Sequence, residues 1–168
     1  SLFGEGYELT KTKDLSQPGQ YACEEKVDLV GTKRTIKGVR ILGPTRPESQ
    51  VEVSMSDTIT LGITPVVRNS GDTEGTPGVK LVGPNGEVDL EKGVIVAARH
   101  IHMDNDDAKE FGVVDKDVVK VKVGGLRGLT FDNVLVRVNQ TYALDMHVDI
   151  EEGNAAGVRN GDLVEIIK

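Results

Sequence analysis

The chain has 168 residues, of which 38% are hydrophobic, and with three Phe, three Tyr and no Trp its core must be built from aliphatic side chains. Its formal net charge of −7 argues against a general nucleic-acid-binding surface, which needs a basic face, but allows an anionic small molecule in a local basic pocket. The single cysteine, Cys23, excludes an internal disulfide and fits a reducing cytoplasm, either as a nucleophile or as a buried bystander thiol. No apolar run approaches the roughly 20 residues of a membrane span, and the first residues do not have the pattern of a signal peptide.

Short alternating or apolar runs, separated by Gly, Pro, Asn and Asp, make up most of the chain, which is typical of an all-β barrel or sandwich. Short helices are predicted at residues 56–61, 104–111 and 151–156, because acidic residues crowd the start of the second, and Gly112 and Gly157 follow the last two. The fold class is therefore mostly β, with short α-helices. In chain order, we predict strands at residues 7–10, 20–23, 26–30, 35–41, 50–54, 79–82, 93–102, 118–123, 129–138, 142–150 and 163–167.

The chain separates into two halves, residues 1–97 and 98–168, that share a loose pattern. Each half contains a Phe-Gly pair and a later alternating segment, at 50–57 and at 143–149, that leads into a short helix. A diverged duplication explains this pattern, and coincidence is the alternative. Because the chain has no initiator Met and opens on an apolar Leu-Phe-Gly after Ser1, we expect a further segment upstream of residue 1.

All three histidines fall in two short segments, His100 and His102 in one and His147 in the other. Side chains two residues apart on a strand point to the same face, so His100 and His102 are expected to project together. Three neutral imidazoles with an open fourth position form a familiar catalytic zinc arrangement. The alternative is a surface strand with two histidines and an unrelated third, because short motif matches often arise without function.

Four segments, at residues 43–54, 67–71, 99–103 and 143–157, give the chain a family resemblance. Together they resemble the PduL-type phosphate propanoyltransferases, which are zinc-dependent phosphotransacylases, and the resemblance covers essentially the whole chain. It implies two small β-barrels capped by short α-helices, with residues 1–97 forming the first barrel and residues 98–168 the second. It also implies the reversible reaction of acyl-CoA with phosphate to give acyl phosphate and CoA.

The resemblance assigns His100, His102 and His147 to one zinc ion and Glu52 to a second. The family's second zinc also uses a His-x-His segment near the N-terminus, on a strand of the second barrel, and these 168 residues do not contain it. We therefore expect one metal in this chain, Glu52 either free or engaged by Arg46, and little activity of the 168 residues alone. The alternating segment around Glu52 is also compatible with an exposed strand carboxylate.

Substrate contacts follow from the same resemblance. Arg46, Arg137 and Ser70 match positions that contact phosphate, for which the planar arginine fork is well suited. Each residue also has a structural alternative. Arg46 could be a solvated loop arginine, Arg137 could form a cross-strand ion pair, and the Ser70 hydroxyl could stabilise a turn. The residues that match positions near CoA are Lys13, Arg40, Leu42, His147 and Asn154.

The implied mechanism requires no protein nucleophile. Zinc acts as a Lewis acid and template for phosphate, and the arginines offset the phosphate charge near the thioester carbonyl. Two alternatives stay open: a zinc-dependent hydrolase, and a non-catalytic metal-binding β-barrel module. The expected partners are acyl-CoA and phosphate, with no nucleic acid and no membrane, and the expected location is the cytoplasm. Homo-oligomerisation and packaging as cargo of a bacterial microcompartment are left open.

Overall fold

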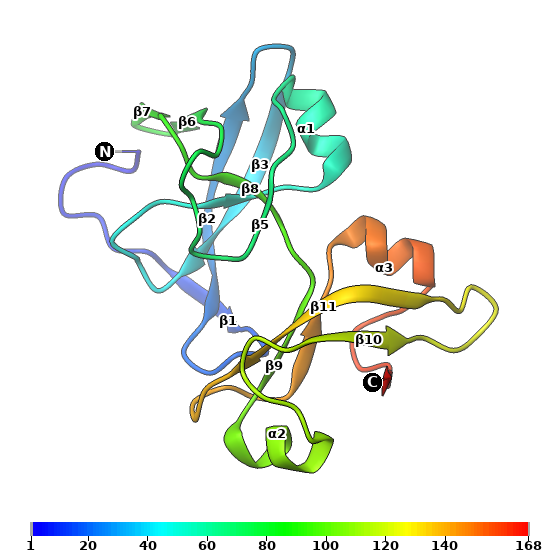
Figure 1. Ribbon diagram of the computed structural model, residues 1–168. Helices are drawn as coiled ribbons and strands as arrows, with labels where there is room; N and C mark the ends of the chain where they lie inside the picture. The colour runs from blue at the N-terminus through cyan, green and yellow to red at the C-terminus, as the bar shows by residue number, and fades with distance from the viewer. Residues whose placement is uncertain (1, 168) are drawn as a thin grey trace. The chain divides into compact units, whose positions relative to one another are not determined.

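The computed structural model describes residues 2–167, which form a mostly β structure with three short helices (Figure 1). By its internal contacts the chain divides into two compact units, Ser1–Ala97 and Ala98–Lys168. A separate cluster of buried hydrophobic side chains lies within each unit. Each unit therefore has its own hydrophobic core, which is a property of a structural domain.

The main sheet of the first unit is built around one long strand, β2 (Tyr21–Val30). Alternate β2 residues are buried, since side chains two apart share a face. Along one edge β2 pairs with β3 (Thr35–Gly43), and along the other with β1 (Lys11–Asp14) at its start and β6 (Val79–Gly83) at its end. The fifth strand, β7 (Gly86–Leu90), forms a hairpin with β6.

A second, parallel sheet of the first unit carries the candidate metal ligand Glu52. Its order is β4 (Val51–Glu52), β8 (Val94–Ala97) and β5 (Val67–Arg68). The central strand β8 begins with three consecutive buried aliphatic residues, as expected of a parallel strand covered on both faces. Helix α1 (Met55–Leu61) follows β4 directly.

The second unit contains one five-stranded sheet of order β12-β9-β11-β10-β13. Strand β9 pairs in parallel with β11, and the other pairs are antiparallel. Ile101, Met103, Val121, Val134 and Val136 form the centre of its core, each at most 3% exposed. The strands are β9 (His100–Met103), β10 (Val118–Lys122), β11 (Thr130–Val138), β12 (Asp145–His147) and β13 (Glu165–Ile167).

All three helices are seven residues long and have the same ends: α1, α2 (Asn105–Phe111) and α3 (Ile150–Ala156). Each begins with a capping box, in which the N-cap side chain and the third helical residue exchange hydrogen bonds with each other's backbone N–H. Each ends at a glycine in the left-handed conformation, which only glycine adopts without strain. These paired signals explain why helices too short to be stable alone form here.

The mostly β prediction is confirmed, with differences in detail. The predicted strand at 93–102 is broken into β8 and β9, and residues 7–10 are not a strand. Strand β7 was missed, although Pro84 and Asn85, a turn-forming pair, make the two-residue turn between β6 and β7. The predicted strand at 142–150 is shorter because Asp149 caps α3. The described strand pairings run as open paths, so closure into barrels stays a prediction.

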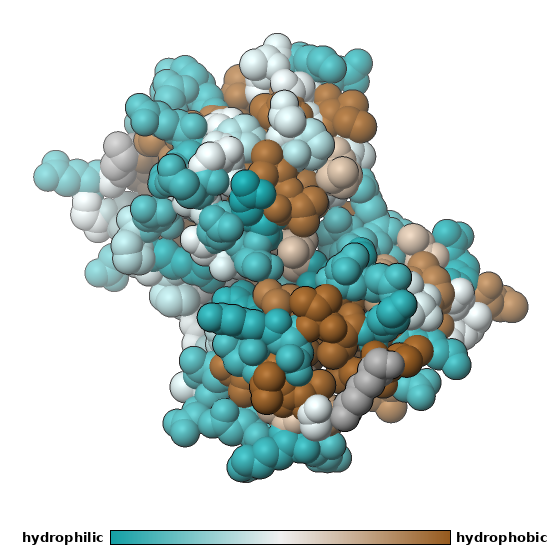
Figure 2. Space-filling model, viewed as in Figure 1, coloured by the Kyte–Doolittle hydropathy of each residue, from teal (hydrophilic) through white to brown (hydrophobic). Residues whose placement is uncertain are grey.

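Apolar surface is exposed in both units, for example at Ile59 in the first and Leu163 in the second, which are 70% and 97% exposed. Figure 2 shows brown apolar side chains gathered on the visible face over the second unit. Within residues 2–167, no helix is both long and apolar enough to cross a membrane.

Candidate metal centre and functional site

The pairing of β9 with β12 brings the three histidines together. The strands are antiparallel, with His147 opposite His100 and Asp145 opposite His102. Because positions two apart share a face, the intervening pair, Ile101 and Met146, points to the other face and packs in the core. The strand alternation thus sorts the polar side chains to one side and the apolar ones to the other.

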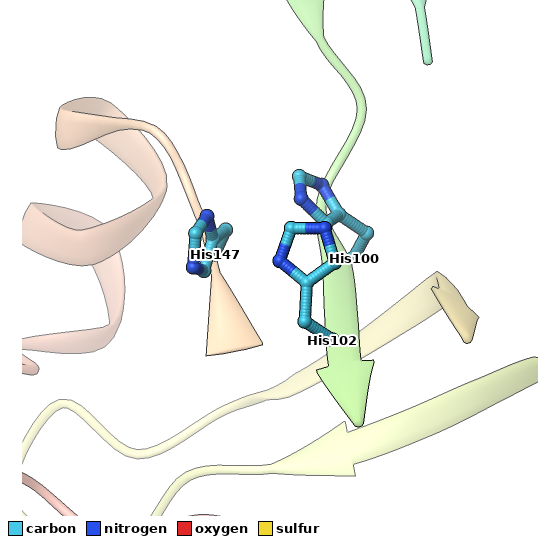
Figure 3. A group of neighbouring side chains, drawn as sticks. All are labelled: His100, His102 and His147. Carbon is cyan, nitrogen blue, oxygen red and sulfur yellow. The ribbon is translucent and has the colours of Figure 1, made fainter. Parts of the chain in front are cut away.

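The three imidazole rings form one compact group (Figure 3). Their ring centroids lie 4.6 Å (His100 to His102), 5.0 Å (His100 to His147) and 4.9 Å (His102 to His147) apart. One nitrogen from each ring lies within 4.8 Å of one nitrogen of each of the others, so a single metal ion can contact all three. Figure 3 shows the two β9 rings facing the β12 ring across the strand pair.

Burial and missing hydrogen bonds make His102 the clearest sign of a ligand. Its side chain is 5% exposed, and its Nδ1 has no hydrogen-bond partner among the described residues. Burial, together with the neighbouring His100 and His147, lowers the pKa of His102 to about 3, so the ring is neutral at physiological pH. A buried unpartnered nitrogen on a neutral imidazole is costly unless something binds it, and a metal ion meets that need. The residues present therefore fit a metal.

The other two histidines are oriented by their own contacts. The Nδ1 of His100 lies 2.8 Å from the backbone oxygen of Ala98, and a ligand histidine commonly uses one nitrogen in this way. The Nε2 of His147 lies 3.3 Å from Asp145 Oδ2. These contacts restrict the rotation of both rings, which is what a preformed ligand set requires.

Two further side chains border the histidine group. Arg137 on β11 is the direct neighbour of His102 in the parallel pairing, and its charge contributes to the lowered pKa of His102. The ring of Tyr142 lies 4.4 Å from that of His102, centroid to centroid. The positive charge of Arg137 beside these imidazoles would favour the binding of an anion next to the histidine group.

An ion pair links the start of β9 to α3. Arg99 Nη1 lies 2.6 Å from Glu152 Oε1, both side chains are less than a third exposed, and Arg99 Nε donates to the backbone oxygen of Asp132. Glu152 is also the capping-box residue of α3, which follows the strand of His147. This link ties the segment of His147 to the segment of His100.

In the first unit, the Glu52 carboxylate is on the exposed side of β4. The expectation that Glu52 is free or engaged by Arg46 is wrong, since its described partner is Gln50, whose Nε2 donates to Glu52 Oε1 at 2.7 Å. The same Nε2 donates to Ser70 Oγ at 2.9 Å, so Glu52 and Ser70 are brought together by one carboxamide. Arg46 is an exposed residue of the loop before β4.

The positions predicted to lie near CoA are mostly exposed. Lys13 and Leu42 flank Ala22 in one row of the main sheet, on strands β1 and β3. Arg40 Nη1 donates to the backbone oxygen of Cys23. Asn154 is exposed on α3. Their contacts with CoA stay predictions.

Sequence reasoning missed Gln50, Tyr142, Asp145 and the Arg99–Glu152 pair. For Gln50 and Asp145 a signal was present, since each stands two residues before a candidate ligand in an alternating segment. Tyr142 and Glu152 are distant from His102 and Arg99 in the chain, so only the fold shows that they are neighbours.

Comparison with known proteins gives one consistent result. A family model described as phosphate propanoyltransferase matches residues 1–159. The phosphate propanoyltransferase of Thermotoga maritima is 57% identical over 169 aligned residues, which cover 100% of this chain and 80% of the relative. The phosphate propanoyltransferase of Clostridioides difficile is 53% identical, and the alignment covers 99% of this chain and 80% of the relative. That of Enterococcus faecalis is 52% identical, and the alignment covers 100% of this chain and 80% of the relative.

Proposed function

The chain belongs to the phosphate propanoyltransferase family, and from this premise we propose that it transfers an acyl group reversibly between CoA and inorganic phosphate at a zinc ion held by His100, His102 and His147. The observation that carries the proposal is the compact histidine group, in which the buried His102 has a nitrogen without a partner among the described residues and an arginine as its neighbour. Three neutral imidazoles are a typical donor set for zinc with an open position.

In the proposed reaction, a phosphate oxygen attacks the thioester carbonyl carbon, a C–O bond forms, the C–S bond breaks and CoA leaves as the thiolate, which takes up a proton. No oxidant or reductant is needed. Zinc, when bound, supplies Lewis acidity and a fixed template for an anionic oxygen.

The chain's own residues supply charge and orientation. Arg137, next to His102 in the sheet, offsets the negative charge of phosphate, and we assign the same task to Arg46 from the family resemblance. Ser70 is assigned to phosphate in the same way. Cys23 is not assigned a role as a nucleophile, since its side chain is fully buried and burial raises the pKa of its thiol.

Several finer parts of the proposal rest on the resemblance alone. They are the closure of each unit into a small barrel, a second metal ligated by Glu52, residence in a bacterial microcompartment, and CoA contacts from Lys13, Arg40, Leu42, His147 and Asn154. The CoA contacts are the most testable of these, because Lys13, Arg40 and Asn154 are exposed and can be replaced without disturbing a core.

The test uses the protein in its full natural length, loaded with zinc and given propanoyl-CoA. We expect thiol release only when phosphate is present, with one acyl phosphate, trapped as its hydroxamate, for each thiol released. Thiol release without phosphate would instead identify a hydrolase. Tight zinc binding with no thiol release would identify a non-catalytic metal-binding module.

A further inference from the structure

Three strand ends that carry candidate ligands have the same construction. Each strand leads into a capping box and a seven-residue helix, and the candidate ligand stands two residues before the helix N-cap. A polar residue also stands four residues before each N-cap, so that the two side chains share a face. The three pairs are Gln50 with Glu52, His100 with His102, and Asp145 with His147.

The two members of each pair are in contact. Gln50 Nε2 lies 2.7 Å from Glu52 Oε1, and Asp145 Oδ2 lies 3.3 Å from His147 Nε2. In the third pair, the rings of His100 and His102 are 4.6 Å apart. Gln50 therefore has the same position toward Glu52 as Asp145 has toward His147, and both resemble residues that orient a neighbouring ligand.

The hydrogen bonds of Gln50 fix which way its carboxamide faces. The backbone N–H of Gly71 points at Gln50 Oε1 at 2.7 Å, and because an N–H can only donate, this atom must be the oxygen. The NH2 group then faces Glu52 Oε1 and Ser70 Oγ and donates to both. The side chain thus joins β4 to the turn that follows β5.

This orientation determines what Ser70 can offer a ligand. Since Ser70 Oγ accepts from Gln50, its own hydrogen points elsewhere and the hydroxyl is available as a donor. The carboxylate of Glu52 is held at the same time by one of its oxygens. We propose that Gln50 is a positioning residue for phosphate use, which orients the Ser70 hydroxyl as a donor to inorganic phosphate and fixes the Glu52 carboxylate. The identity of the ligand rests on the proposed function.

The next turn of the same loop, closed by the Thr76 N–H and the Thr73 oxygen, has its own independent links. Thr73 Oγ1 donates to Glu48 Oε2 at 3.1 Å, and Thr76 Oγ1 contacts both the Thr73 oxygen and the Gly93 N–H. These links, with the backbone hydrogen bond from the Asp72 N–H to the Asn69 oxygen, should keep the loop folded when the Gln50 carboxamide is lost. The Thr73→Val variant removes the neighbouring link without touching Glu52 or Ser70, which makes it a matched control.

The experiment compares Gln50→Ala, Gln50→Glu and Thr73→Val in the full-length protein. We expect both Gln50 variants to raise the KM for phosphate about tenfold, with the KM for propanoyl-CoA unchanged within about twofold, since a hydrogen bond to an ionised group is lost at the phosphate side only. Gln50→Glu keeps the side-chain volume and should have the larger effect, because it places two carboxylates side by side. Phosphate binding, followed without turnover by 31P NMR titration, should weaken in parallel.

The control outcomes separate the two levels of the proposal. Unchanged phosphate KM and binding in both Gln50 variants would overturn the positioning role, as would an equal shift in Thr73→Val, which would indicate a general loosening of the turn. If the unsubstituted protein forms no acyl phosphate but still binds phosphate in a Gln50-dependent way, the proposed function fails and the positioning role stands.

Discussion

In the second unit two of the three candidate ligands, His100 and His102, are buried, at 8% and 5% exposed, whereas in the first unit Arg46, Glu52 and Lys13 are exposed to solvent. Burying an unpartnered polar atom destabilises a fold. The burial of His102 Nδ1 without a described partner is therefore structural evidence that a ligand binds at this nitrogen. An exposed arginine or carboxylate has no such cost, and its geometry is compatible with any role. The geometry of the second unit is thus itself evidence for a metal centre, whereas the assignment of substrate contacts in the first unit rests on the family resemblance.

The largest expected effect is on metal binding by the second unit. His102→Ala removes one of three ligands, and zinc affinity, measured by competition with a chromophoric chelator, should fall by more than the about 10- to 100-fold typical of lost supporting residues. Arg137→Ala, on the same sheet face, is the matched control and should retain zinc. Equal zinc affinity in all three proteins would exclude the histidine group as the metal site.

The next effect tests whether the exposed residues of the first unit act in the same reaction as those of the second. Arg46→Ala and Arg137→Ala should each raise the KM for phosphate, or lower turnover, by about tenfold or more, because each removes a charge-assisted hydrogen bond to phosphate. The KM for propanoyl-CoA should change less. Normal phosphate kinetics in Arg46→Ala would remove Arg46 from phosphate recognition.

A smaller effect concerns the link that supports the second unit's site. Glu152→Gln weakens the ion pair with Arg99 but keeps an acceptor for the capping box, so we expect a loss of about 1 kcal/mol in the free energy of unfolding. Zinc affinity should fall with it, as His147 loses support. Asp106→Asn, which removes the exposed pair with Lys109 in α2, is the control and should change neither value measurably.

The smallest effect concerns Glu25, a buried carboxylate of the first unit that resembles His102 in having a polar atom without a partner in the described part of the chain. Glu25 is 7% exposed and its Oε2 has no partner among the described residues. Burial raises the pKa of Glu25, but hydrogen bonds from its own backbone N–H, the Thr10 N–H and the Tyr7 hydroxyl outweigh burial, and the net pKa is lowered. A lowered pKa stabilises the fold above the carboxyl's unfolded pKa, and this stability is lost as the pH falls through the folded pKa.

We therefore expect the melting temperature of the wild type to fall in acid more steeply than that of Glu25→Gln, measured from neutral pH to below the ordinary glutamate range. At neutral pH the variant should be the less stable of the two. Parallel pH profiles would show that the pKa of Glu25 is the same in the folded and the unfolded chain. The folded environment of Glu25 would then have no effect on its titration.

Much of the local structure could be predicted from sequence because its causes are local. Asp104 and Gly112 mark the ends of α2 within a few residues, and alternation places His100 and His102 on one face of β9. The single strand predicted at 93–102 was wrong because its apolar run continues into the histidines, while the backbone changes sheets between β8 and β9. Periodicity records which residues are buried but not where a strand changes partner.

By itself, the sequence determined the mostly β class, the capped helices and the family, because these depend on neighbouring residues and on motifs that can be read in order. Only the tertiary structure decided that His147 pairs opposite His100, that Arg137 lies beside His102 and that Gln50 holds Glu52 and Ser70. Such contacts join residues on different strands, and their register is set by the packing of whole sheets rather than by any short segment. The proposed chemistry depends on those contacts.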